Sequence, residues 1–167
     1  YKSEGKLGYY KVEIFKAYAP YYFDYKEKLL CIVSAINLVK LLTVESQSNV
    51  NVFNLIGDLY SIINIDDWVK EYIFWELKLL EIVGFNLQLN KIAKSEVINN
   101  EKKYFVGSNS EKKYVPNFLI DRDEKKLDKK TLSKALKLVG DFLEKNVLKP
   151  NNISYPNSRL DFVNLFK

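Results

Sequence analysis

Apolar residues recur at helical spacing in four separate stretches of this chain, and this pattern restricts the fold more than any other feature. The clearest stretch begins near Asp128 or Lys130 and ends before Pro150. Its polar face carries lysines, and its apolar face consists of Leu132, Ala135, Leu136, Val139, Phe142, Leu143 and Val147. An amphipathic helix of this kind must bury its apolar face against other elements. The sequence therefore predicts a mainly α domain with a packed core.

Two of the other stretches lie near the start of the chain. Residues 25–42 predict a central helix whose main stripe is Leu29, Ile32, Val33, Ile36 and Val39. Residues 52–63 predict a second helix with Asn51 as its N-cap and an apolar face formed by Val52, Leu55, Ile56, Leu59 and Ile63. The longest apolar run falls short of the ~20 residues that span a bilayer, so we expect no membrane segment.

The third helix has the best-marked ends. Asp66 and Asp67 suit a helix N-terminus, and Gly84 suits a left-handed C-terminal cap. After Pro150, a short last helix is expected, with Asn157 as its N-cap and with Leu160, Val163 and Phe166 facing inward. The expected fold is thus four main helices and a short C-terminal helix.

Two regions depart from this helical pattern. Residues 86–128 are polar and predict a loop-rich insertion, in which 102–106 and 112–115 could pair as a hairpin. Residues 7–18 alternate in the manner of a strand. A lone strand is unstable, so it must pair with the helical part or be the remnant of a sheet domain upstream, and we favour the remnant. The chain starts at Tyr1 and has no methionine, so we expect an N-terminal portion to be missing.

Composition excludes most catalytic chemistry for this chain. Histidine is absent, and the single thiol, Cys31, lies in an apolar helix where a core role is expected. No Gly-rich phosphate loop or nucleophile elbow occurs. The carboxylate pairs at 66–67 and 121–124 fit a helix cap and a solvated loop. We therefore predict no catalytic residue, no metal site, no cofactor and no enzyme activity.

Charge permits only weak attraction to nucleic acid. The net charge is +5, and the only arginines are Arg122 and Arg159. Lysine lacks the forked donors of arginine, so any such contact should be salt-sensitive and blind to sequence. The alternative is that the lysines serve only solubility.

Two features of the third helix stand out. Glu76 falls on the face that should be buried, so it needs a lysine, arginine, tyrosine or helix N-terminus as partner, and a structural role is favoured over a binding role. Aromatic residues Tyr72, Phe74 and Trp75 surround more than one side of the helix. Either they pack into core on both sides, or some of them line a groove for a peptide.

Four stretches carry a family resemblance. Residues 75–92, WELKLLEIVGFNLQLNKI, are similar to a segment of the RecO family, in which an aromatic-Glu-Leu helix ends in Gly-aromatic and a Leu-x-Leu turn. VPNFLI at 115–120 and GDFLEKNVLKP at 140–150 resemble the alphaproteobacterial branch. LGYYKVEIF at 7–15 resembles the last strand of the family's oligonucleotide-binding (OB) barrel.

The resemblance implies a domain division and a function. Residues 1–20 would be the remnant of the OB-fold, and residues 21–167 the helical domain. The function implied is DNA repair: a cytoplasmic recombination mediator that helps to load RecA on single-stranded DNA covered by single-stranded-DNA-binding protein, and that promotes strand annealing with RecR. Contact with DNA would fall mainly on the barrel, so this chain should bind single strands weakly.

The resemblance also suggests a site, with departures. Phe74, Trp75 and Lys78, near the lysines of the first and last helices, could form a groove for the acidic, apolar-ended tail of the single-stranded-DNA-binding protein. Ile92 stands where many members have the first zinc-binding cysteine, so no zinc is expected. A frequent basic residue is replaced at Ile73 or Phe74, and the loop 94–113 is shorter than usual. The rival interpretation is a helical protein–protein adaptor or regulatory domain without a nucleic-acid role.

Overall fold

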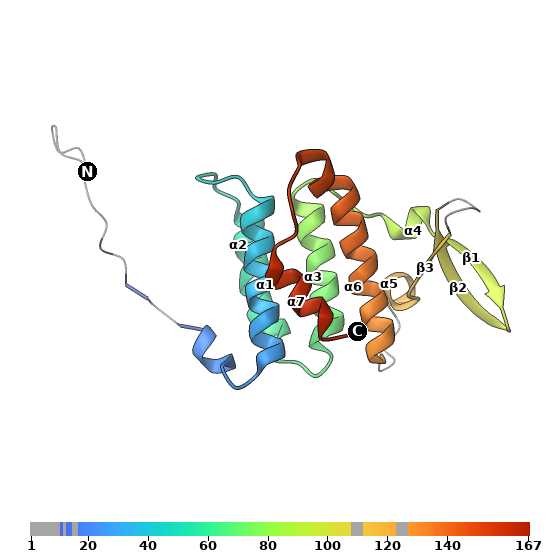
Figure 1. Ribbon diagram of the computed structural model, residues 1–167, viewed down its shortest axis with the longest axis horizontal. Helices are drawn as coiled ribbons and strands as arrows, with labels where there is room; N and C mark the ends of the chain where they lie inside the picture. Colours follow the sequence, from blue (N-terminus) through green and yellow to red (C-terminus); the bar gives the residue numbers. More distant parts are fainter. Residues whose placement is uncertain (1–10, 12, 15–16, 108–111, 123–126) are drawn as a thin grey trace.

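The computed structural model describes residues 11, 13–14, 17–107, 112–122 and 127–167. Within them, four long helices form the body and a short one crosses it, which confirms the mainly α prediction (Figure 1). The long helices are α1 (Lys26–Leu42), α2 (Val50–Ile62), α3 (Trp68–Ile82) and α6 (Lys129–Leu143), and the short C-terminal helix is α7 (Asn157–Asn164). Shorter helical turns are η1 (Ala19–Tyr22), α4 (Leu89–Ile92), α5 (Phe118–Asp121), η2 (Glu144–Leu148) and η3 (Lys149–Asn151).

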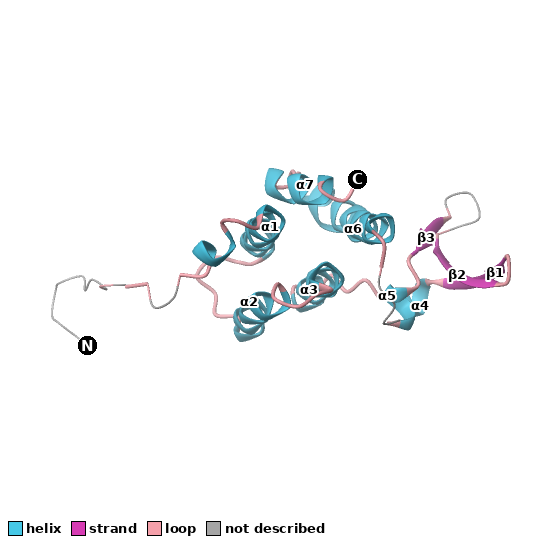
Figure 2. Ribbon diagram, turned by 90° about the horizontal axis from the view of Figure 1, so that it is seen from below, coloured by secondary structure: helices cyan, strands magenta, loops and turns pink. Residues whose placement is uncertain are grey.

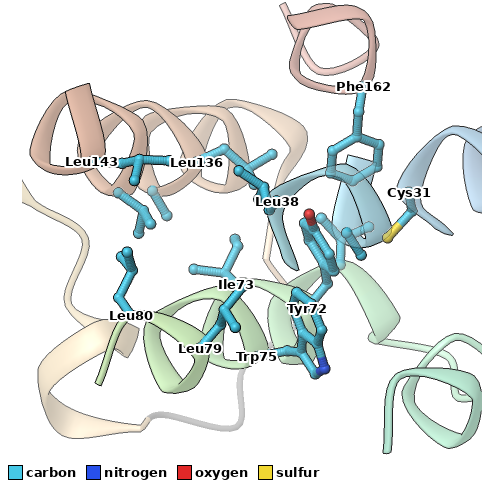
Figure 3. Packing of buried hydrophobic residues seen from close by; sticks show 14 of the residues in the cluster. Cys31, Leu38, Tyr72, Ile73, Trp75, Leu79, Leu80, Leu136, Leu143 and Phe162 are labelled. Atoms are coloured by element: carbon cyan, nitrogen blue, oxygen red, sulfur yellow. The ribbon is translucent and has the colours of Figure 1, made fainter. Parts of the chain in front are cut away.

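The body has two layers. Figure 2 looks along the long helices and shows α2 and α3 in one layer and α1, α6 and α7 in the other. The core lies between the layers, where α3 contributes a nearly continuous apolar surface of Tyr72, Ile73, Trp75, Leu79 and Leu80 (Figure 3). Leu38, Leu136, Leu143 and Phe162 face them from the other layer. Burial of this apolar surface is the main stabilising contribution to the fold.

Helix ends follow capping chemistry, although not always at the predicted residue. Gly84 has φ of 92° and ends α3. Two backbone hydrogen bonds close this end of the helix: Phe85 N donates to Leu80 O, and Gly84 N donates to Glu81 O. The N-cap of α2 is Asn49 rather than Asn51, because Asn49 already accepts a hydrogen bond from the Val52 amide at 3.1 Å. In the same way, Pro156 precedes α7, and Asn157 is its first residue rather than its cap.

Two predicted helix faces are confirmed only in part, since Ile32, Val39 and Phe166 are buried as predicted. Val33 of the expected α1 stripe is 41% exposed, whereas Cys31, Ala35 and Leu38 are buried. Residues 25–42 are apolar almost all round, so periodicity alone could not choose the inner side. On α7, Leu160 is 47% exposed and Phe162 is fully buried. The direction from which α7 crosses α1 and α6 decides this face.

The polar insertion contains a small antiparallel sheet with strands β1 (Lys94–Ile98), β2 (Glu101–Val106) and β3 (Lys113–Val115). The predicted hairpin of 102–106 with 112–115 is confirmed as β2 and β3. Strand β1 was not predicted, because all five of its residues are exposed and show no alternation of burial. The sheet lies at the end of the helical body opposite α2 (Figures 1 and 2). The strand expected over 7–18 falls largely outside the described residues, so the division at residue 20 stays a prediction.

Candidate functional site

A groove of about 680 Å³ lies beside α3, the turn that follows it, and α5. Its lining combines buried or half-buried apolar residues with exposed polar ones. The apolar members are Phe74, Leu77, Leu87, Leu89, Leu119 and Ile120, and the polar members are Lys78, Glu81, Asn86, Gln88, Asn90, Lys91 and Arg122. A groove lined by both apolar and cationic side chains suits a peptide that has both apolar and acidic residues.

Positive charge dominates the edge of the groove. Three cationic side chains, Lys78, Lys91 and Arg122, face one carboxylate, Glu81. Lys78 Nζ lies 2.7 Å from a Glu81 carboxylate oxygen, so this lysine is already paired. The groove therefore attracts anions chiefly through Lys91 and Arg122.

Phe74 and Arg122 form one wall together. The guanidinium carbon of Arg122 lies 5.4 Å from the centre of the Phe74 ring, and Phe74 packs edge-to-face on Phe118 with centroids 5.9 Å apart. Arg122 has a left-handed backbone, with φ of 51°, and caps α5. This turn brings its side chain back towards α3.

The structure separates the three residues predicted for the groove. Phe74 and Lys78 line it, but Trp75 is 2% exposed and faces the other side of α3. The indole N–H of Trp75 donates to the carbonyl of Leu55 on α2 at 2.6 Å, and its ring stacks on Tyr72. These contacts place Trp75 in the core, so it does not line the groove.

The groove also differs from the prediction in its charges. No lysine of α1 or α7 lines it. Lys91 and Arg122 take that place, and sequence reasoning did not assign them to the site. The available signal was their position two residues after the apolar residues Leu89 and Ile120.

Glu76 lies in the core and has three polar contacts. Arg159 of α7 donates from Nη2 to Glu76 Oε2 at 2.9 Å, and its Nε lies 2.8 Å from Oε1. The Tyr72 hydroxyl donates to Oε1 at 2.7 Å. Arg159 also donates to the Leu136 carbonyl of α6 at 3.1 Å. This buried network joins α3, α6 and α7, and none of its residues lines the groove.

Burial and the charge of Glu76 shift the pKa values of the ionisable groups around this network. Desolvation, followed by the negative charge of Glu76, raises the pKa of the Cys31 thiol and of the Tyr72 hydroxyl well above their ordinary values. Burial disfavours the charged form of Arg159, yet the charge and hydrogen bond of Glu76 together with Tyr72 and Tyr155 outweigh burial and raise the pKa of the guanidinium. Cys31 is therefore a neutral thiol and Arg159 a permanent cation at neutral pH.

The groove contains few kinds of ionisable group. Its ionisable side chains are lysines, one arginine and one glutamate. Across the residues described above, no group of three or more Cys, Asp or Glu side chains is placed to hold a metal ion. In the same part of the chain, no helix is long and apolar enough to cross a membrane.

Comparison with known proteins gives consistent matches. The model of the family "Recombination protein O C terminal" matches residues 26–154. The chain is 33% identical over 104 residues to the DNA repair protein RecO of Rickettsia canadensis, covering 62% of this chain and 42% of that protein. It is 22% identical over 176 residues to RecO of Rhodospirillum centenum, and 27% identical over 169 residues to RecO of Rickettsia akari.

The coverage of these relatives differs. The alignments with Rhodospirillum centenum and Rickettsia akari cover 97% and 94% of this chain, and 70% of each relative. The match to Rickettsia canadensis spans less than half of that relative. No solved structure matches the chain significantly.

Proposed function

Because the chain belongs to the RecO family of DNA repair proteins, we propose that it supplies the helical part of a recombination mediator. The observation that carries this proposal is the family match over 26–154, which covers α1 to α6 and both borders of the groove. The proposed role is non-enzymatic. It consists of helping RecA to load on single-stranded DNA that is covered by single-stranded-DNA-binding protein, and of promoting annealing together with RecR in the cytoplasm.

The groove beside Phe74 is the proposed contact for the single-stranded-DNA-binding protein. The tail of that partner is acidic and ends in an apolar residue. Its apolar end would fill the floor next to Phe74 and Leu119, and its carboxylates would face Lys91 and Arg122. Binding should weaken with salt, because the cationic groups lie at an open edge.

Fluorescence anisotropy with a labelled tail peptide tests this contact, at two salt concentrations and with a scrambled peptide as control. Arg122→Ala should weaken binding by about fivefold to tenfold, since it removes one charge-assisted contact. Lys40→Ala, an equal loss of charge at an exposed position of α1, should leave the affinity unchanged. Trp75→Ala is unsuitable as a probe because Trp75 belongs to the core.

The outcome separates the proposed role from its rival. Preference for the native tail, lost in Arg122→Ala and kept in Lys40→Ala, supports the mediator. Equal binding of native and scrambled peptides, together with no capture of purified RecR, would instead favour a helical adaptor without a nucleic-acid role.

A further inference from the structure

A second pocket, of about 430 Å³, lies between α6 and α7, which are neighbours in the same layer (Figure 2). Its apolar walls are Leu136, Tyr155, Leu160 and Val163. Small-molecule sites in proteins have volumes of about 300–1,000 Å³ and mostly apolar walls with a few polar groups. This pocket has both properties, and it shares no lining residue with the groove beside α3.

Arg159 brings a buried cation to the pocket. Its side chain lines the pocket and is only 2% exposed. Nε lies beside Glu76, and Nη2 donates to Glu76 and to the Leu136 carbonyl. A guanidinium has five N–H groups, so two of them remain on Nη1. Among the residues that the structure describes, no acceptor occupies these two N–H groups, so they can hold an oxygen atom of a ligand.

Two irregularities of α6 occur at this pocket. Gly140 lies inside the helix, where glycine is less favourable than alanine. A Cβ atom there would lie 3.2 Å from the hydroxyl oxygen of Tyr155, which donates to the Gly140 carbonyl. Directly after α6, the chain forms the π-helical turn η2, whose first residue, Glu144, lines the pocket. Such departures from a regular helix are common at functional sites.

Charges at the pocket favour an anion that carries one negative charge. The lining contains two exposed lysines, Lys137 and Lys167, and two carboxylates, Asp141 and Glu144. Each carboxylate is already paired with a lysine from outside the lining, at 2.7 and 3.1 Å. The two lysines of the lining do not belong to these pairs, so they can attract an anion. The carboxylates would still repel a dianion such as phosphate more strongly than a monoanion.

We propose that this pocket binds a small monocarboxylate with an aliphatic body. The carboxylate accepts hydrogen bonds from Nη1 of Arg159 and faces Lys137, while the aliphatic body packs against Leu160 and Val163. Such a ligand contacts α6 and α7 together, so its binding stabilises the folded chain. The proposal goes beyond the function proposed for the groove, because it concerns a different site and a different class of ligand.

The test uses the 167-residue chain with octanoate as the probe. Binding is followed by the chemical shifts of the ¹⁵N-labelled backbone amides and by the thermal midpoint. Octanoate should shift the amides around Gly140 and Leu160 in a saturable manner and raise the midpoint. Octanamide has the same shape but no charge, and it should bind at least about fivefold more weakly. Acetate, which lacks the aliphatic body, and inorganic phosphate should give no saturable shift.

Two variants, each with a matched control, locate the site. Leu160→Ala shortens an exposed part of the wall and should weaken octanoate binding at least about threefold. Ile65→Ala, at a position outside the pocket that is 46% exposed compared with 47% for Leu160, should leave the affinity unchanged. Lys137→Ala should weaken the binding of octanoate but not of octanamide. Lys130→Ala removes an equal charge near the start of α6 and should change neither.

Circular dichroism without ligand must show that each variant remains folded. The proposal is overturned if octanoate gives no saturable shift, if octanamide binds as tightly as octanoate, or if Leu160→Ala and Ile65→Ala bind octanoate equally. Displacement of the labelled tail peptide by octanoate would also overturn it, because the ligand would then occupy the groove. Loss of peptide binding in Arg122→Ala, with octanoate binding intact, shows that the two sites act independently.

Discussion

Arg159 and Glu76 are 83 residues apart in the sequence and form an ion pair inside the core, with Nη2 of Arg159 2.9 Å from Oε2 of Glu76. Both side chains are 3% exposed. The pair links α7 to α3, while the Tyr72 hydroxyl and the Leu136 carbonyl provide further hydrogen bonds. Each charge is buried only because the other is present, so the two residues must be considered together.

Removing one member of this pair should be far more costly than replacing both. Glu76→Leu leaves a buried guanidinium without its anion and should lower the free energy of unfolding by about 3–5 kcal/mol. The double variant Glu76→Leu with Arg159→Met should recover most of this loss, since it removes both charges. Urea unfolding followed by circular dichroism measures the difference. Equal stabilities of the single and double variants would contradict the pairing.

Two glycines should respond to alanine with opposite signs. Gly84 has φ of 92° and open space around it, so Gly84→Ala should cost about 1–2 kcal/mol through backbone strain alone. Gly57 lies on the exposed side of α2, also in open space, and Gly57→Ala should stabilise the chain by about 0.5–1 kcal/mol. Thermal and urea unfolding compare both variants. A destabilising Gly57→Ala would show that the site is more crowded than the structure indicates.

The start of α2 can be located by mutation. Asn49 accepts the hydrogen bond of the Val52 amide, so Asn49→Ala should lower the free energy of unfolding by about 1 kcal/mol. Asn51 lies inside the helix and is exposed, and Asn51→Ala should change stability by less than about 0.5 kcal/mol. The same urea series decides between them. A larger effect at Asn51 would show that Asn51 is the N-cap of α2, as the sequence predicted.

Cys31 should be inert in the folded chain. Burial raises the pKa of its thiol well above the ordinary value of 9.0, so Ellman's reagent should react slowly at pH 8 and quickly in urea. The raised pKa also makes stability depend on pH. The stabilising contribution is fully present below the ordinary pKa, and it is lost as the pH rises towards the folded value, because only the unfolded thiol releases its proton.

A control isolates the contribution of this thiol. Cys31→Ala should show a smaller loss of stability between pH 8 and pH 10 than the parent chain does. Tyr72, whose pKa is also raised well above its ordinary 10.0, contributes a further loss at higher pH in both proteins. Parallel pH curves for the two chains, or rapid labelling of the native thiol, would contradict the burial of Cys31.

The periodicity of apolar residues predicted where the long helices lie better than it predicted which side of each helix is buried. The helix over 66–84 was predicted closely because its two ends carry their own signals, an aspartate pair and Gly84. The inner side of α1 was predicted only in part, since Ile32 and Val39 are buried but Val33 is exposed on a helix that is apolar almost all round. Strand β1 was missed because its residues are exposed on both faces, and the alternation that marks a strand depends on burial.

Sequence reasoning likewise identified only some of the residues that line the groove. Phe74 and Lys78 could be proposed from one helix, but Trp75 could not be excluded until the position of α2 was known. Lys91 and Arg122 reach the groove through α4 and α5, whose short turns carry no periodic signal.

The sequence by itself determined which segments become the long helices, that Glu76 would be buried and would need a partner, and that histidine chemistry is absent from this chain. These properties are local, because spacing, capping and composition act within a few turns. Only the tertiary structure decided that the partner of Glu76 is Arg159, and that Lys137, Tyr155 and Leu160 line one pocket. Such contacts depend on how helices cross, and packing across the whole core determines the crossing.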